Sequence, residues 1–344
     1  MDLPATQDDY YVTAEEIAAI PLTALRYCEQ GAVENPWRVL DECRNHRLAI
    51  KRWPAYAFAD VATYIETGII AYGTTNLGSI ILKVQALSVL GPWRITRGVY
   101  CFDAELSRSL ADTDPAEEIP IDILLRLPEW SVCIFGAGLG VVCAFLSITF
   151  GDDSSPPEIV IVTIHADQTR TLLAVALNPG TTIASGVDAM IKRQFELSSL
   201  KHYENLVEEK PRFTKMVSTI LAHALYLCAD EPDMAPAPPR PIPKRTRSGS
   251  RFFPPDTGSR IVPVGARFGA IFRRTRAEFA VAENNAKTGR SMPPHWRKAH
   301  WSHFWTGPRK PDKPGQQKKI VKWIAPTFVN ATPEDIPVVV REVQ

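Results

Sequence analysis

The spacing of apolar and polar residues predicts a helical amino-terminal part. Thr13 followed by Glu16 is typical of a capping box, in which each side chain bonds to the other residue's backbone N–H. Helical spacing of apolar residues follows, with a kink or restart expected at Pro21, and Pro36 stands at the favoured first turn of a second helix. Further helices, richer in apolar residues, indicate more buried positions. The later helices are predicted over 36–49, 55–70 and 77–90.

The pattern changes after Gly91 to segments with extended character. Trp93 to Phe102 is predicted to be extended, and Ile119 to Leu127 has a short helical pattern closed by Pro128. Four segments rich in Val, Ile, Phe and Thr then predict an antiparallel meander. Helical spacing returns afterwards, so the fold class is α+β: a helical amino-terminal part and an antiparallel sheet packed with helices. The four strands are expected at Ser131–Phe135, Val141–Phe150, Glu158–His165 and Thr171–Leu177, and the two helices at 184–200 and 212–228.

A proline-rich stretch separates this body from the carboxyl-terminal part. Residues 232–263 favour extended polyproline geometry and then a flexible cationic strip, so they are interpreted as a linker. A helix at about 266–284 and a strand or hairpin at 318–329 are expected beyond it. The sequence therefore predicts a body over 1–231, the linker, and a small basic module over 264–344.

Composition places the chain among folded proteins of a reducing compartment. Its 344 residues suffice for two domains, and 45% are hydrophobic. No run of about twenty apolar residues predicts a membrane helix, and the acidic start lacks the features of a secretory signal. Six cysteines are scattered without a Cys-x-x-Cys pair, which is typical of buried thiols. We therefore expect a cytoplasmic protein with no membrane partner and no disulfide framework.

Charge is segregated along the chain. Residues 238–325 hold 20 Lys and Arg against 4 Asp and Glu, whereas residues 1–237 hold 18 against 31. A basic block of this size indicates a nucleic-acid or acidic protein partner. Alternatively, the acidic and basic halves dock on each other. A helix end carries three carboxylates, Asp230, Glu231 and Asp233. They could pair with the basic half, bind a cationic peptide, or form a solvated turn.

The most unusual segment lies inside the basic block. Three of the seven histidines and three of the eight tryptophans fall within eleven positions, with two cations between them. Indoles can stack on bases or clasp a peptide, and cations neutralise phosphate, so we expect an RNA- or ribosome-binding role. A small aromatic core is the alternative. The candidate binding residues are His295, Trp296, Arg297, Lys298, His300, Trp301, His303 and Trp305, joined by Lys318, Lys319 and Lys322.

The same segment leaves two chemical alternatives open. Three histidines can bind zinc, but the flanking prolines leave little room for a helix, and no carboxylate or cysteine lies inside the segment. We therefore predict no metal. As catalytic candidates, His300 or His303 could act as general base on an RNA 2′-hydroxyl, with Arg297 or Lys298 holding the phosphate and His295 as acid. A non-enzymatic role is favoured over this ribonuclease.

Nucleotide-binding motifs are absent, and the body offers weaker peptide-binding candidates. The glycines of 136–140 lack the Gly-x-Gly-x-x-Gly spacing and precede a strand, which favours a glycine hairpin. No Walker loop exists, so no cofactor is expected. Trp93, Arg94, Tyr100 and Trp130 lie beside predicted strands and are candidates for a peptide site, although packing at a helix–sheet junction is favoured for Trp130.

Several segments, in this order, resemble a type V-A anti-CRISPR family, the second of that type to be named. The resemblance spans about 85–330 and rests on the ordered set, above all on the His/Trp segment and the ending that follows it. The segments are Leu90-Gly-Pro-Trp-Arg94, Gly98-Val-Tyr100 with Asp103, Leu127-Pro-Glu-Trp130, Leu227-Cys-Ala-Asp-Glu-Pro-Asp233, Pro294-His-Trp-Arg-Lys-Ala-His-Trp-Ser-His-Phe-Trp-Thr-Gly307 and Lys322-Trp-Ile-Ala-Pro-Thr-Phe-Val-Asn330.

The resemblance implies that the protein acts on production of the type V-A effector nuclease and not on the finished enzyme. Family members recognise a nascent effector peptide and cause translation-dependent loss of the effector mRNA. The implied partners are that peptide and the translating ribosome or mRNA. We assign peptide reading to the acidic body and the RNA-directed task to the basic module. A mobile-element regulator that binds nucleic acid, or a ribonuclease unrelated to CRISPR, is the alternative.

Overall fold

A computed structural model describes the chain from Thr13 to Val329, with gaps. The described residues are 13–46, 61–113, 121–150, 157–176, 181–197, 206–229, 232–236, 239, 241–247, 249–274, 295–297, 299–307, 318–324 and 327–329.

The amino-terminal part is helical, as predicted. Thr13 accepts the N–H of Glu16 at 3.2 Å, while the Glu16 carboxylate accepts the N–H of Thr13 at 2.8 Å, which confirms the capping box. Pro21 lies inside the first helix without ending it. The helices are α1 (Ala14–Glu29), α2 (Pro36–His46), α3 (Val61–Tyr72) and α4 (Leu77–Thr96).

Helix α4 is longer than the pattern predicts, and this corrects the expected strand from Trp93. The helix runs through Pro92 to Thr96, and Arg97 then adopts the left-handed conformation and donates its N–H to the Trp93 carbonyl at 2.8 Å. Every residue from Val84 to Ile95 is buried, and this burial outweighs the cost of proline in a helix. Strand β1 (Gly98–Phe102) therefore begins five residues later than expected.

A six-stranded sheet forms the centre of the molecule, in the order β5-β4-β3-β2-β1-β8. Strands β2 to β5 pair antiparallel, as predicted for the meander, and glycines with positive φ form the hairpin between β2 and β3. Strand β1 pairs parallel to both β2 and β8, so the sheet is mixed and not wholly antiparallel. These strands are β2 (Ser131–Gly138), β3 (Val141–Thr149), β4 (Glu158–His165), β5 (Arg170–Ala176) and β8 (Arg260–Val264).

Strand β8 also corrects the interpretation of residues 232–263 as a linker. Its residues 260–263 belong to that stretch, and Val262 is buried in the sheet. A two-stranded ribbon of β6 (Lys244–Thr246) and β7 (Gly249–Arg251) lies in it as well. The proline-rich stretch is therefore anchored to the body, because its end supplies the edge strand beside β1.

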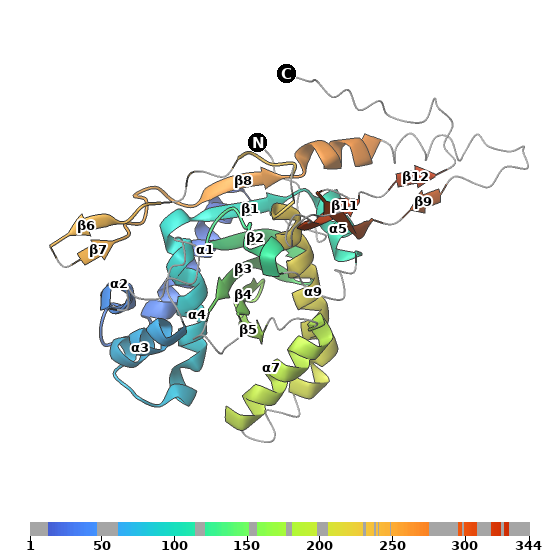
Figure 1. Ribbon diagram of the computed structural model, residues 1–344. Coiled ribbons are helices and arrows are strands. Elements are labelled where there is room, and N and C mark those ends of the chain that lie inside the picture. The colour runs from blue at the N-terminus through green and yellow to red at the C-terminus, as the bar shows by residue number, and fades with distance from the viewer. Residues whose placement is uncertain are drawn as a thin grey trace, which may run out of the picture.

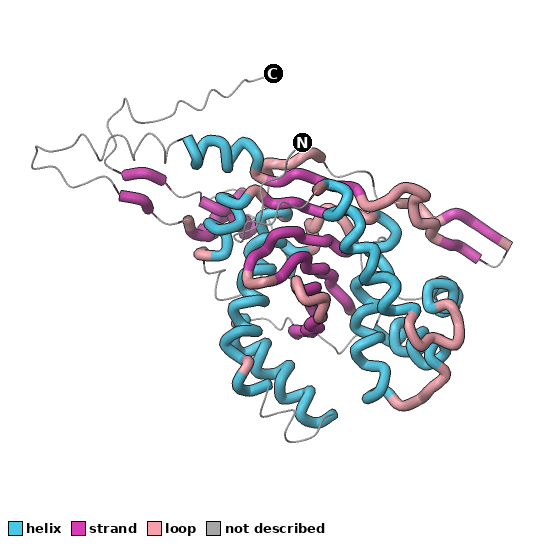
Figure 2. The backbone as a smooth tube through the Cα atoms, turned by 180° about the vertical axis from the view of Figure 1, so that it is seen from behind, coloured by secondary structure: helices cyan, strands magenta, loops and turns pink. Residues whose placement is uncertain are grey.

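Helices cover both faces of the sheet. Figure 1 shows α4 on one side of the strands and α9 with α7 on the other, and Figure 2 shows the same layers from behind. Side chains alternate between the two cores: Ile134 of β2 packs with the α9 side, whereas Cys133 packs with the α4 side. Two buried faces explain why these strands are nearly continuous in apolar residues. The helices of the second face are α5 (Ala104–Ala111), α6 (Ile121–Leu124), α7 (Ile183–Leu197) and α9 (Lys210–Leu227).

The six cysteines are buried and form no disulfide. Burial raises the pKa of Cys28 and of Cys101 to about 12, which keeps both thiols protonated. Among the residues that the structure describes, no helix has the length and apolar character needed to cross a bilayer.

Candidate functional site: the docked basic segment

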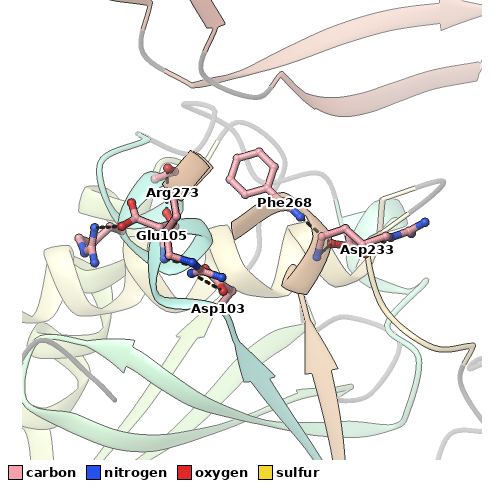
Figure 3. Close-up of polar contacts among 8 residues, drawn as sticks. Asp103, Glu105, Asp233, Phe268 and Arg273 are labelled. Carbon is pink, nitrogen blue, oxygen red and sulfur yellow. Dashed lines mark hydrogen bonds and ion pairs between the residues drawn. The ribbon is translucent and has the colours of Figure 1, made fainter. Parts of the chain in front are cut away.

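Asp233 anchors the start of the first basic helix, at residues 266–274. Its Oδ2 accepts the backbone N–H groups of Arg267 and Phe268 at 2.9 and 3.0 Å, and its Oδ1 accepts Arg267 Nε at 2.6 Å (Figure 3). These N–H groups belong to the first turn of the helix, where a carboxylate is favoured by the helix dipole. The Asp233 hydrogen bond also raises the pKa of Arg267. Of the three carboxylates at the end of α9, Asp233 pairs with the basic block; Asp230 and Glu231 lie outside the described residues.

Asp103 holds the other end of the same helix. It caps α5 by accepting the N–H of Glu105 at 2.9 Å, and both of its oxygens accept Arg273 Nη1, at 3.1 and 2.8 Å (Figure 3). Gly269 packs so closely on this carboxylate that an added Cβ would lie 2.0 to 2.2 Å from its atoms. Asp103 and Asp233 thus fix the helix on the acidic body at two points.

A row of aromatic rings extends this docking to the His/Trp segment. Trp323 packs on Tyr226 of α9 at a ring distance of 5.6 Å and on Phe268 at 5.2 Å. Phe268 stacks on Phe272 at 4.7 Å. Trp323 belongs to β11 (Lys318–Ile324), which pairs antiparallel with β10 (His300–Thr306). The hairpin that carries much of the His/Trp segment is therefore anchored on the body.

Strand register sorts the hairpin positions into two faces. Trp301 lies opposite Trp323, and both rings pack partly buried against the main core. Neighbouring positions point to opposite faces of a strand, so positions 300, 302 and 304 lie on the other face. There Phe304 is 43% exposed, and His300 and Ser302 are half-buried. Trp301 thus belongs to the packed face, contrary to the role in RNA binding expected for it.

The remaining candidates of the segment are placed only by their backbone. His295, Trp296 and Arg297 form β9, which pairs antiparallel with β12 (Thr327–Val329). Lys318, Lys319 and Lys322 lie in β11, and Lys318 and Lys322 occupy the face opposite Trp323, across from Thr306 and Ser302. His303 and Trp305 occupy positions on the face of Trp301, and Lys298 lies outside the described residues.

The family model for AcrVA2-like proteins, the anti-CRISPR type V subtype A2 family, matches residues 100–331, from β1 to just beyond β12. The chain belongs to this family. A crystal structure of AcrVA2 has a similar fold, with a TM-score of 0.59 and 18% identity over 90% of this chain and 98% of that one. No curated protein matches the chain.

The two alternative general bases for RNA cleavage occupy opposite faces of the hairpin in this AcrVA2-like fold. His300 and His303 are three positions apart on one strand, so they lie on opposite faces of the hairpin. Only one of these two alternative bases can therefore share a face with a bound phosphate, and the proposed acid His295 lies on another strand, β9, which is placed only by its backbone. Within the part of the chain that the structure describes, no three His, Cys, Asp or Glu residues gather as a metal site.

The candidate peptide residues of the AcrVA2-like body are buried, so their side chains are engaged within the fold. Trp93 is 0% exposed and donates its indole N–H to the Gly98 carbonyl at 2.9 Å. Arg94 pairs with Asp41 at 3.1 Å, inside the fold. Tyr100 donates its hydroxyl to Glu129 at 3.0 Å. Trp130 packs edge-on against Phe252 at 5.2 Å, as favoured from its sequence context. Trp93 and Arg94 are buried because α4 is longer than expected and its last turns, which contain both residues, belong to the core.

Two acidic residues of this AcrVA2-like site differ in how visible they are in the sequence. Asp103 directly precedes Ala104 and Glu105, which is a recognisable helix N-cap. Glu129 has no such signal. Glu129 pairs with Arg260, which lies 131 residues away in β8 and donates a hydrogen bond to its carboxylate.

Proposed function

We propose that this AcrVA2-like protein lowers production of the type V-A CRISPR effector: it binds a nascent segment of the effector and causes translation-dependent loss of its mRNA. Membership of the family gives the anti-CRISPR role. The mechanism is the one implied by the resemblance of the sequence motifs. The bacterial cytoplasm, where effector and ribosome meet, is the place of action.

The outward face of the β10–β11 hairpin supports a contact with RNA or the ribosome. Phe304 exposes an apolar ring there although the opposite face of the hairpin is packed on the body. His300 lies on the same face, and Lys322 pairs with Ser302 across the strands. An exposed ring between cationic positions can stack on a base while lysines neutralise phosphate. This face is the observation that carries the RNA-directed part of the proposal.

The docking of the basic helix reduces the set of residues that are available to bind RNA or the ribosome. Arg267 and Arg273 already pair with carboxylates of the body, so part of the positive charge is used within the chain. Trp301 and Trp323 serve as anchors. We therefore assign the RNA or ribosome contact to Phe304, His300, Lys318 and Lys322, which share the outward face, and retain His295, Trp296 and Arg297 of β9 as further candidates.

A reporter assay tests the mechanism. Cells co-express the protein with a reporter fused in frame to the effector coding sequence, and reporter mRNA and protein are both measured. A matched reporter carries the same segment shifted by one base, so the RNA is almost identical and the peptide differs. Both mRNA and protein should fall only for the in-frame fusion. Equal loss from both reporters would indicate that RNA sequence is read, and no loss from either would refute the proposal.

Substitutions test the role of the hairpin face. Phe304→Ala should change stability little, because Phe304 is 43% exposed and lies on the hairpin face away from the core, and it should weaken the loss of reporter mRNA. Leu82→Ala is the matched control, since Leu82 is similarly exposed on α4, far along the chain. Full activity of Phe304→Ala would remove this face from the mechanism. RNA cleavage by the purified protein without ribosomes would instead indicate a ribonuclease.

A further inference from the structure

The β6–β7 ribbon projects from the body beside α2, as Figure 1 shows and as Figure 2 shows from behind. Its strands pair antiparallel, with Lys244 opposite Arg251 and Arg245 opposite Ser250. The ribbon is a separate two-stranded sheet and does not join the six-stranded one. Because an isolated two-stranded ribbon is only marginally stable in water, its position depends on contacts at its base.

The base of the ribbon is anchored on the body. Phe252 directly follows β7, and its ring packs edge-on against Trp130 at 5.2 Å. Arg251 Nε lies 3.6 Å from Oδ2 of Asp41 in α2, and Asp41 also pairs with Arg94 at 3.1 Å. The Asp41 carboxylate is therefore already engaged by two guanidinium groups. These contacts fix where the ribbon leaves the body, so its other cations are presented at a defined place on the molecular surface.

Three of these cations are available to a partner. Lys244, Arg245 and Arg247 are exposed, and among the described residues no carboxylate pairs with any of them. The sequence explains why, because residues 234–255 contain five Lys and Arg but no Asp or Glu. The basic helix at 266–274 differs in this respect, since its arginines pair with carboxylates of the body. The ribbon is therefore a positively charged surface whose charge is not neutralised by the described part of the chain.

An exposed aromatic ring lies beside these cations. Phe253 is 53% exposed, and Lys244 Nζ lies 5.9 Å from the centre of its ring. A nucleotide offers a partner to both groups, because its phosphate pairs with Lys and Arg while its flat base stacks on an aromatic ring. The carboxylates of an acidic protein would match the cations alone. The combination therefore favours a nucleic acid over an acidic protein.

We propose that the β6–β7 ribbon binds single-stranded RNA, with Lys244, Arg245 and Arg247 on phosphates and Phe253 stacked on a base. Phosphate contacts carry no sequence information, so the ribbon binds RNA of any sequence. The choice of RNA as the nucleic acid rests on the proposed function, whereas the preference for a nucleic acid rests on the ribbon alone. Figure 1 shows β11 well away from β6 and β7, so the ribbon is a second surface, separate from the outward hairpin face.

Photocrosslinking of the full-length protein to a single-stranded RNA that carries 5-bromouridine tests the ribbon. Light attaches this base to nearby aromatic side chains, and the yield at Phe253 against RNA concentration gives the affinity of the ribbon and not of the hairpin. Changing Lys244, Arg245 and Arg247 together to Gln should lower this affinity at least about tenfold. The slope of log affinity against log salt should fall by about 2, because each phosphate contact contributes about 0.7 on a single strand. Thermal unfolding should be unchanged, because the three side chains are exposed.

The matched control changes Arg26, Lys192 and Arg212 together to Gln, since these cations are also exposed but lie on α1, α7 and α9. It alters the net charge equally and should keep both affinity and salt slope. Equal losses in the two triple variants, no crosslink at Phe253, or displacement of the RNA by polyglutamate at equal charge concentration would overturn the proposal. Depletion in the reporter assay without RNA at Phe253 would refute the ribbon and leave the proposed function standing. RNA at Phe253 without depletion would support the ribbon and count against the proposed function.

Discussion

Arg273 donates from Nη1 to both carboxylate oxygens of Asp103, at 3.1 and 2.8 Å, although 170 residues separate the two along the chain. Asp103 is 5% exposed at its side chain, so the first helix of the basic block is fixed to the interior edge of the acidic body. Charge segregation in the sequence therefore has an intramolecular component. The positive charge that remains for a partner lies on other residues of the block, among them the exposed Lys244, Arg245 and Arg247.

Arg273→Ala should destabilise the protein by about 1–2 kcal/mol, because it leaves a buried carboxylate with one fewer charged donor. Arg38→Ala is the control: Arg38 pairs with Glu34 at an exposed helix surface, where such a pair contributes less than about 0.5 kcal/mol. Urea unfolding of both variants checks the difference. Equal stability of the two would show that the Asp103 pair does not hold the helix.

Gly269→Ala should destabilise the protein by about 1–2 kcal/mol, although alanine favours helices over glycine by about 1 kcal/mol. The added methyl would meet the Asp103 carboxylate, which cannot move without giving up the cap of α5 and the bond to Arg273. Gly258→Ala serves as the comparison, since an added Cβ there meets nothing within 4 Å. Thermal unfolding should separate the two substitutions, and a stabilised Gly269→Ala variant would contradict the close docking.

His223 should make the stability fall with acid. Burial lowers its pKa from 6.5 to about 4, with Nδ1 donating to the Thr219 carbonyl at 2.7 Å and Nε2 accepting from Ser107 at 2.9 Å. In the unfolded chain the His223 imidazole becomes protonated below about pH 6.5, whereas in the folded chain it stays neutral until about pH 4. This contribution is therefore complete above pH 6.5 and is lost towards pH 4, at up to about 1.4 kcal/mol per pH unit.

Urea unfolding between pH 4 and 7 measures this slope. His223→Asn should flatten it even if the variant is less stable throughout. His165, whose pKa burial also lowers, contributes in the same direction, so His165→Asn should flatten the curve as well. An unchanged slope in His223→Asn would mean that the imidazole titrates normally in the folded state.

Local patterns were sufficient for the elements that depend on neighbours in sequence. The capping box of Thr13 and the alternating strands β2 to β5 involve residues close along the chain, and both are confirmed. Strand β8 could not be predicted in this way, because its partner is β1, more than 150 residues earlier, and its own residues include Pro263. Parallel pairing leaves no turn signal in the sequence.

The candidate site shows the same limit. The His/Trp segment is visible from composition, but which of its rings pack on the body depends on the register of β10 with β11 and on Tyr226 of α9. Gly91 and Pro92 predict that a strand begins at Trp93 and Arg94, whereas burial of α4 extends the helix past both.

Truncations test where the body ends. A chain of residues 1–237 lacks β8, and with it the buried Val262 and Val264, each of which contributes about 1.5–3 kcal/mol. It also leaves β1 as an unpaired edge, so we expect it to aggregate or to unfold without cooperativity. A chain of residues 1–274 keeps β8 and the docked helix and should unfold cooperatively, bind peptide as well as the full chain does, and fail to deplete effector mRNA. Depletion by the 1–274 chain would exclude the hairpin from the mechanism, and a cooperatively folded 1–237 chain would show that β8 is dispensable to the body.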